Sequence, residues 1–223
     1  AIEERRGFMF NRVGILGGMG PLAGVHFQKL IIEATPVERD QDHIQIVCFT
    51  NPQIPDRTIS LISDGGQGYL MGIKESIEIL EGCGADFFVI PCNTAHAHFK
   101  KIQLLTPIPF VNMIEVAVSK FTTFFPKAKS VGLLATEGTI AANIYQEAFL
   151  PFNVNCVIPE FGDQKIVSEV IYNIKRGKYK NSIRKLCVIL DEFKEKGAES
   201  AILGCTELSL CYKTLVRRGY NVF

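Results

Sequence analysis

The deciding stretch of this sequence reads Asp86-Phe87-Phe88-Val89-Ile90-Pro91-Cys92-Asn93-Thr94-Ala95-His96. Its apolar, strand-forming run stops at Pro91, and the cysteine is followed by Asn93 and Thr94, which belong to residue types that cap helices. We therefore expect Cys92 to lie where a buried strand gives way to the N-terminus of a helix. Unpaired backbone N–H groups and the positive end of the helix dipole favour a thiolate or a bound carboxylate at such a junction.

The same arrangement recurs near the C-terminus as Ser200-Ala201-Ile202-Leu203-Gly204-Cys205-Thr206-Glu207-Leu208. A glycine-containing apolar segment precedes each cysteine at nearly the same distance along the chain, at 13–20 in the first half and 131–138 in the second. We infer two similar α/β lobes that face Cys92 and Cys205 toward each other across one cleft. Two opposed thiols are what a racemase needs, because one can remove a proton from one face of a carbon while the other returns a proton to the opposite face.

Apolar periodicity and glycine turns place the other elements. In the first lobe we expect strands at 12–18, 44–50 and 109–112 and before Cys92, and helices from Pro21, at about 69–82 and after residue 112. In the second lobe we expect strands at 130–135 and 154–158 and before Cys205, and helices at about 138–149, 163–176, 182–197 and 206–217. Because a helix follows each strand, both sheets should be parallel. We place the lobe boundary near Met113, which gives domains 1–113 and 114–223.

Composition fits two such lobes and excludes several other classes of protein. The 223 residues are enough for two lobes of about 100 residues each. A net charge of +1 without basic clusters predicts no nucleic-acid or acidic-membrane partner. The apolar runs are far shorter than the roughly 20 residues of a membrane span, and the first residues show no signal-peptide core. Seven cysteines without a framework spacing predict a reducing, cytoplasmic location.

Two motifs suggest a dinucleotide cofactor and a metal ion, but the residues around them do not support either. Gly18-x-Gly20-x-x-Ala23 matches the dinucleotide fingerprint, but the second strand ends in Thr50-Asn51 rather than in an acidic residue, and Pro21 lies inside the turn. A loop that directs backbone N–H groups at a small anion explains these glycines better. His96 and His98 would diverge on a helix, so a structural role is favoured over metal binding. We expect neither a cofactor nor a metal.

Two cations are candidate carboxylate ligands only because of the cleft. Arg57 follows a rigid Pro-Asp pair in a loop, and Lys165 opens a helix. Taken alone, each is a solvated surface charge; in a cleft between two lobes, each could hold a carboxylate. The cysteines outside the two junctions keep the simpler interpretation of core thiols.

Several motifs together resemble the cofactor-independent aspartate/glutamate racemase family, and within it the aspartate racemases. The matching segments are Gly17-Gly-Met-Gly-Pro-Leu-Ala23, Asn51-Pro-Gln-Ile-Pro-Asp-Arg57, Pro91-Cys-Asn-Thr-Ala-His96, Gly132-Leu-Leu-Ala-Thr136 with Gly138-Thr139, and Gly204-Cys-Thr-Glu-Leu208. The paired cysteine motifs carry the specificity. Members of this family usually continue past the position of Phe223 with an Asp-Pro turn and a helix that covers the first lobe, whereas this sequence ends there.

The resemblance implies two pseudo-symmetric lobes, no pyridoxal phosphate, often a homodimer, and an acidic amino acid as substrate. It implies that Cys92 and Cys205 are the acid/base pair. The Pro-Asp-Arg segment favours aspartate over glutamate. The substrate contacts that it implies are Asn51, Arg57, Thr58, Asn93, Thr94, Ala95, Thr136, Thr139, Lys165 and Thr206.

Two other functions stay open at this point. One is a related carbanion-forming enzyme on the same scaffold, such as an isomerase, a decarboxylase or a one-way dehydratase; the presence of both cysteines argues against it. The other is a catalytically silent acidic-amino-acid binding protein, for which two thiols facing one ligand would be an oxidation liability. If the protein is a racemase, we expect a helix N-terminus to lower the pKa of a cysteine enough to make it a base near neutral pH.

Overall fold

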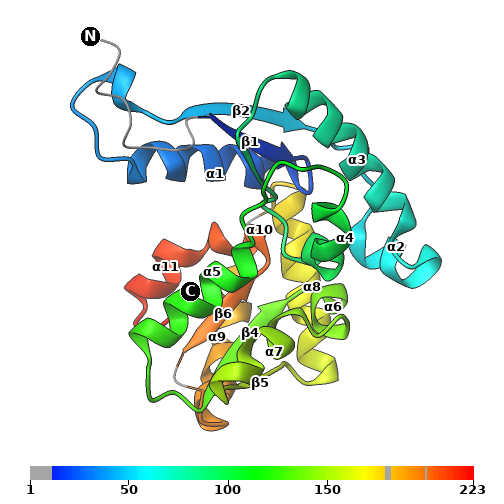
Figure 1. Ribbon diagram of the computed structural model, residues 1–223. Coiled ribbons are helices and arrows are strands. Elements are labelled where there is room, and N and C mark those ends of the chain that lie inside the picture. The colour runs from blue at the N-terminus through cyan, green and yellow to red at the C-terminus, as the bar shows by residue number, and fades with distance from the viewer. Residues whose placement is uncertain (1–11, 179–181, 199) are drawn as a thin grey trace.

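Two parallel three-stranded sheets form the framework of the protein, one in each half of the chain (Figure 1). The computed structural model describes residues 12–178, 182–198 and 200–223. The strand order is β2-β1-β3 in the first sheet and β5-β4-β6 in the second. We call the half with the first sheet the first lobe and the half with the second sheet the second lobe. The predicted α/β fold with two similar parallel sheets is confirmed.

The first sheet carries helices that the sequence predicted and one α-helix that it did not. Its elements are β1 (Arg12–Gly17), α1 (Pro21–Ala34), η2 (Asp40–Asp42), β2 (Gln45–Thr50), α2 (Arg57–Asp64), α3 (Gln67–Gly82), β3 (Phe87–Val89), η3 (Thr94–His98) and α4 (Phe99–Gln103). The unpredicted α-helix is α2, whose first residue, Arg57, was expected to lie in a loop. It forms because the Asp56 carboxylate accepts hydrogen bonds from the backbone N–H groups of Thr58 and Ile59, which caps the helix.

The second half repeats this order with more broken helices. Its elements are α5 (Met113–Phe124), β4 (Ser130–Ala135), α6 (Glu137–Ala141), α7 (Ile144–Phe149), η4 (Leu150–Phe152), β5 (Asn155–Val157), α8 (Phe161–Lys175), α9 (Ser182–Glu195), β6 (Ala201–Gly204), α10 (Thr206–Ser209) and α11 (Tyr212–Arg217).

Two predicted helices of the second lobe are wrong as continuous elements. The helix expected at 138–149 is interrupted at Asn143, whose φ of 52° lies in the left-handed region that asparagine tolerates better than most residues. The helix expected at 206–217 divides into α10 and α11.

Each sheet is extended by one bridge to a short segment beside its third strand. Phe110 pairs with Phe88 of β3, and Val222 pairs with Ala201 of β6, both in parallel. The strand expected at 109–112 is therefore wrong, because its pairing is limited to that bridge and Asn112 already caps α5. The two bridges strengthen the likeness between the lobes.

A glycine at the same place in each central strand lets a phenylalanine ring approach the backbone. A Cβ at Gly14 would collide with the Phe88 ring, and a Cβ at Gly132 would collide with the Phe193 ring. Both rings are fully buried in the cores of their lobes. The repeated Val-Gly pattern of the sequence thus has the same cause in both halves, which is close packing of an aromatic ring.

Helix α5 belongs by contact to the second sheet. Its buried residues Ile114, Val118 and Phe121 lie in one cluster with Val131 and Leu133 of β4. The domain division at Met113 stays a prediction, although α5 begins at that residue.

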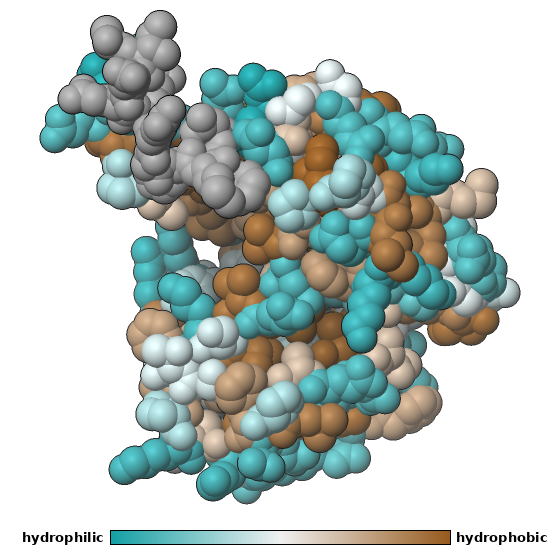
Figure 2. Space-filling model, in the orientation of Figure 1, coloured by the Kyte–Doolittle hydropathy of each residue, from teal (hydrophilic) through white to brown (hydrophobic). Residues whose placement is uncertain are grey.

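The lobes meet at the carboxyl ends of their strands, and α8 reaches from the second lobe up to the first (Figure 1). On one side of this junction a groove of about 260 Å³, with apolar walls, lies between α1 and α5, where Figure 2 shows a hollow. Within the described residues, no helix has both the length and the apolar character needed to cross a membrane.

Candidate active site

Cys92 lies just beyond β3 and is 5% exposed. The helix expected here begins as a short 3-10 turn, η3, which leads into α4. Asn93 occupies the cap position but does not cap with its side chain. Its Oδ1 instead accepts a hydrogen bond of 2.6 Å from the hydroxyl of Tyr145 in the second lobe. The Asn93 side chain therefore ties the Cys92 segment to the opposite lobe.

Cys205 occupies the equivalent position beyond β6 and is 6% exposed. It is the N-cap residue of α10, which is a single turn of helix. Its Sγ lies 3.0 Å from Oε2 of Glu207. Burial raises the pKa of the Cys205 thiol well above its usual value, and the adjacent Glu207 raises it further. The expected lowering by a helix N-terminus is therefore wrong for Cys205, because burial and a neighbouring carboxylate outweigh one turn of helix dipole.

Arg57 connects the two cysteine junctions electrostatically. It is 7% exposed, and its Nη1 donates to the backbone carbonyls of Ile54 at 3.3 Å and Pro55 at 3.0 Å. Burial lowers its pKa, but Cys92, Asp56 and Glu207 act in the opposite direction and raise it overall. Because Glu207 also contacts the Cys205 thiol, Arg57 lies in one polar cluster with both cysteine junctions.

Three threonine hydroxyls form a closed triangle across the interface between the lobes. Thr94 Oγ1 lies 2.9 Å from Thr136 Oγ1 and 3.0 Å from Thr139 Oγ1, and the last two are 3.0 Å apart. All three residues are buried. Thr136 also caps α6 by accepting the backbone N–H of Thr139. The structure thus brings together three of the predicted binding residues from both lobes.

Sequence reasoning missed a second group that joins the lobes around Asp56. The Asp56 Oδ2 accepts a hydrogen bond of 3.2 Å from the hydroxyl of Tyr172 and lies 3.9 Å from Nζ of Lys175. Burial, followed by the charge of Asp56, raises the pKa of Tyr172 to about 12. The Asp56-x-Thr58 spacing could have revealed the cap, but no local pattern marked Tyr145, Tyr172 or Lys175.

The remaining predicted site residues differ in how close they lie to this cluster. Ala95 is fully buried in η3, and the half-buried Thr206 opens α10 directly after Cys205. The Asn51 amide donates to Ser76 Oγ at 3.3 Å and accepts from the N–H of Gln53, so it shapes its own loop.

Thr58 lies at the interface between the lobes, whereas Lys165 lies on the surface. Thr58 lies on the wall of a cavity of about 60 Å³ between the lobes, together with Thr136 and Tyr172. Lys165 is exposed on α8, with its Nζ 4.2 Å from the centre of the Phe161 ring. Its described contact is with that ring and not with the polar cluster.

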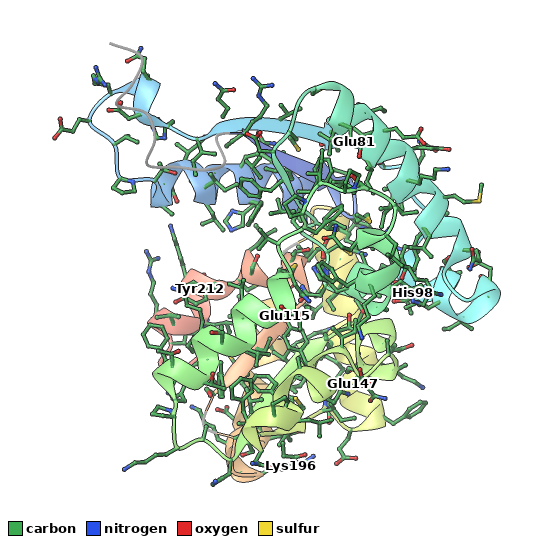
Figure 3. All side chains as sticks on the ribbon, viewed as in Figure 1. Glu81, His98, Glu115, Glu147, Lys196 and Tyr212 are labelled. Carbon is green, nitrogen blue, oxygen red and sulfur yellow. The ribbon has the colours of Figure 1, made fainter. Side chains whose placement is uncertain are left out.

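The two histidines have structural contacts. The His96 Nδ1 bonds to the backbone carbonyl of Cys92 at 2.9 Å, and its ring stacks on Phe99. Burial lowers the pKa of His96 to about 4, so its ring is neutral at pH 7. His98 stacks on Tyr69 beside the turn between α2 and α3 (Figure 3). In the described part of the chain, no group of three or more His, Cys, Asp or Glu residues is arranged to hold a metal ion.

Two lobes with a cysteine at each matching strand end, meeting in one polar cluster, define the architecture of a two-lobed racemase. The sequence model of the Asp/Glu/hydantoin racemase family matches residues 16–221, and the chain belongs to this family. Because racemases are isomerases, the protein is an enzyme of the isomerase class.

Individual relatives agree with this placement. The chain is 30% identical over 203 residues to the broad specificity amino-acid racemase RacX of Bacillus subtilis, covering 88% of this chain and 86% of that protein. It is 26% identical over 171 residues to the glutamate racemase of Shewanella woodyi, covering 70% of this chain and 62% of that enzyme.

Solved structures share the fold. The Picrophilus torridus aspartate racemase superimposes with a TM-score of 0.83 at 32% identity, over 95% of this chain and 87% of that one. The glutamate racemase of Francisella tularensis, solved with D-glutamate, superimposes with a TM-score of 0.65 at 21% identity, over 96% of this chain and 76% of that one.

Proposed function

We propose that the protein interconverts L- and D-aspartate without a cofactor, using Cys92 and Cys205 as the two acid/base groups. The observation that carries this proposal is that two buried cysteines at equivalent strand ends share one polar cluster through Arg57 and Glu207. The likeness to the Picrophilus torridus aspartate racemase supports aspartate as the substrate.

The proposed reaction balances with one cysteine thiolate, one cysteine thiol and no further reactant. In one direction the Cys92 thiolate removes the α-proton, so the C–H bond breaks and an S–H bond forms. The electron pair left on the α-carbon spreads into the α-carboxylate, and the Cys205 thiol returns a proton to the opposite face. In the other direction the two cysteines exchange roles. The exchange leaves one thiol and one thiolate after every turnover.

The carbanion needs donors on the carboxylate into which its charge spreads. The buried Arg57 guanidinium is suited to hold a substrate carboxylate, as are the hydroxyls of Thr94, Thr136 and Thr139. The backbone N–H groups of Asn93–Ala95 and Thr206 lie beside the cysteines and would add donors. Asn51, Thr58 and Lys165 complete the proposed set of ligands.

The three threonine hydroxyls that would hold the substrate carboxylate are bonded to one another across the interface between the lobes. We propose that the threonine triangle opens on binding, so that hydroxyls now bonded to each other turn to the substrate carboxylate. Closure would then align the α-carbon between the two sulfurs.

A broader amino-acid specificity is the second candidate. The likeness to the broad specificity racemase of Bacillus subtilis, over 88% of this chain, favours it. Glutamate belongs to the same proposal because several relatives are glutamate racemases. For the location and assembly we keep the predicted reducing cytoplasm and homodimer as proposals.

The test is to incubate the purified protein with L-aspartate in deuterium oxide, without added cofactor, and to follow the α-proton by NMR while D-aspartate is assayed. Loss of the α-proton together with D-aspartate would support the proposal. Exchange without D-aspartate would favour another carbanion-forming enzyme, and binding without exchange would favour the silent binding protein.

Variants then test the cysteine pair. Cys92→Ser and Cys205→Ser should each abolish racemisation, because a serine hydroxyl is a far weaker acid than a thiol. Cys83→Ser is the matched control and should keep wild-type turnover, because Cys83 is exposed and not, as the sequence suggested, a core thiol. Wild-type turnover in either of the first two variants would overturn the two-thiol mechanism.

A further inference from the structure

Glu207 is a buried carboxylate that no part of the predicted site included. It is 4% exposed, and each of its two oxygens has a different partner. Oε2 lies 3.0 Å from the Cys205 Sγ, and Oε1 accepts the backbone N–H of Gly20 at 3.3 Å. Thr206 Oγ1 is 3.5 Å from Oε2. A carboxylate is costly to bury unless its oxygens accept hydrogen bonds, and both of these oxygens have a donor.

The bond to Gly20 joins the lobes. Gly20 lies in the glycine turn of the first lobe, and Glu207 lies on α10 of the second. The anion expected at this turn is therefore supplied, in the free protein, by a side chain of the protein itself. A Cβ at position 20 would lie 3.0 Å from Oε1, so the absence of a side chain there permits the approach. This contact fixes where Oε1 lies and, with it, the direction in which Oε2 faces.

The contact with Cys205 is of a different kind. A carboxylate can only accept a hydrogen bond, so a sulfur at 3.0 Å must carry the proton. If Cys205 were a thiolate, two negative groups would face each other in a site with little water, which is strongly unfavourable.

We propose that Glu207 is a third functional residue, which holds Cys205 in its thiol form in the free enzyme and so makes Cys205 the proton donor of the first turnover. This inference rests on the proposed two-cysteine mechanism and adds an asymmetry to it. Cys92 has a different neighbour, because it interacts with the Arg57 cation. The fold is nearly symmetric, but the groups next to the two sulfurs are not.

Other charged and titratable groups also lie around Cys205. Lys175 of α8 lowers the pKa of Cys205, whereas burial first and Glu207 second raise it. Tyr145 of α7 and Tyr172 of α8 also face this thiol, and burial keeps both phenols neutral. Among the residues that the structure describes, only Glu207 is in hydrogen-bond contact with the sulfur.

The test measures the protonation of Cys205 directly. The rate at which iodoacetamide alkylates Cys205 is followed against pH by mass spectrometry of its peptide, in the wild type and in Glu207→Gln. Glutamine keeps the shape and an acceptor for the Gly20 N–H but removes the charge. We expect alkylation of Cys205 at pH 8 to become roughly tenfold faster or more, with its midpoint moved to lower pH, since one pKa unit is a factor of ten.

Glu147→Gln is the matched control, because Glu147 is exposed on α7 (Figure 3). It should leave the Cys205 profile unchanged. An unchanged profile in folded Glu207→Gln would overturn the proposal. If Cys205→Ser is inactive at the same time, the two-cysteine mechanism stands and only the role of Glu207 fails; if Cys205→Ser turns over normally, the mechanism itself fails.

A second measurement does not depend on the folding of Glu207→Gln. The infrared spectrum of the wild type minus that of Cys205→Ser isolates the S–H stretching band of Cys205. We expect this band to be present at pH 8 and displaced from the position of a free thiol by its strong acceptor. Absence of the band at pH 8 would contradict the proposal.

Discussion

The phenol of Tyr145, in the second lobe, donates a hydrogen bond of 2.6 Å to the side chain of Asn93, which directly follows Cys92 in the first lobe. Both side chains are buried. Burial raises the pKa of Tyr145, so its hydroxyl keeps its proton and acts as the donor. The segment after one cysteine is thus held in place by the lobe that carries the other.

Tyr145→Phe should therefore destabilise the protein and slow turnover. The Asn93 amide oxygen would be buried without a donor, which costs about 1–3 kcal/mol of unfolding free energy. Urea unfolding measures the loss of stability, and steady-state assays with L-aspartate measure kcat. Tyr212→Phe is the control, because Tyr212 is 44% exposed on α11 (Figure 3). Equal stability of Tyr145→Phe and the wild type would contradict this role.

Arg57→Lys should raise the KM for aspartate despite keeping the charge. Lysine cannot reproduce a planar fork that bonds to two backbone carbonyls and still presents donors to a carboxylate. Loss of a hydrogen bond to a charged group costs about 1.5–3 kcal/mol, equivalent to a roughly ten- to hundredfold weaker interaction. Initial rates over a range of aspartate concentrations test this. Arg217→Lys is the control at an exposed site and should have the wild-type KM. If the KM of Arg57→Lys were also that of the wild type, Arg57 would not be a substrate ligand.

The Lys165→Met variant tests whether Lys165 is a substrate ligand or only an exposed cation. Because Lys165 is exposed and contacts the Phe161 ring, its loss should change the unfolding free energy by less than about 1 kcal/mol. If it reaches the substrate as proposed, the KM for aspartate rises while stability is kept. Lys101→Met, at another exposed lysine, is the comparison. A KM equal to that of this control would exclude Lys165 from the set of ligands.

His96 should make the protein less stable as the pH falls. Burial lowers its pKa in the folded protein to about 4, whereas the ordinary value is 6.5. Between these pH values only the unfolded chain binds the proton, so this group destabilises the fold progressively from pH 6.5 down to about 4, by up to about 3 kcal/mol.

Urea unfolding at pH 7 and pH 5 checks the effect of His96. His96→Asn keeps a donor for the Cys92 carbonyl but does not titrate. Its stability should therefore fall less between the two pH values than that of the wild type. Parallel losses in both proteins would show that His96 does not cause the dependence.

Apart from the strand wrongly expected at 109–112, local patterns of the sequence were enough to predict the strands, their parallel pairing and the two cysteine junctions. The runs before Cys92 and Cys205 form β3 and β6 because each is apolar, short and followed by turn and cap residues. The repeat was visible because both halves use the same local signals, down to the glycines under Phe88 and Phe193. Predictions about helix caps failed where the cap depends on a side chain's partners. The Asn93 side chain bonds to Tyr145 and does not cap a helix. The Asp56 side chain caps α2, a helix that was not predicted.

The sequence by itself thus determined the two lobes and the positions of the two thiols, because strand, turn and cap preferences act over a few neighbouring residues. Only the tertiary structure decided what surrounds each thiol. Cys205 is held beside Glu207, Glu207 is oriented by Gly20, and Arg57 interacts electrostatically with both Glu207 and Cys92. These contacts join residues that lie far apart in the chain, and protonation depends on burial and on the nearest charges, which no local pattern records.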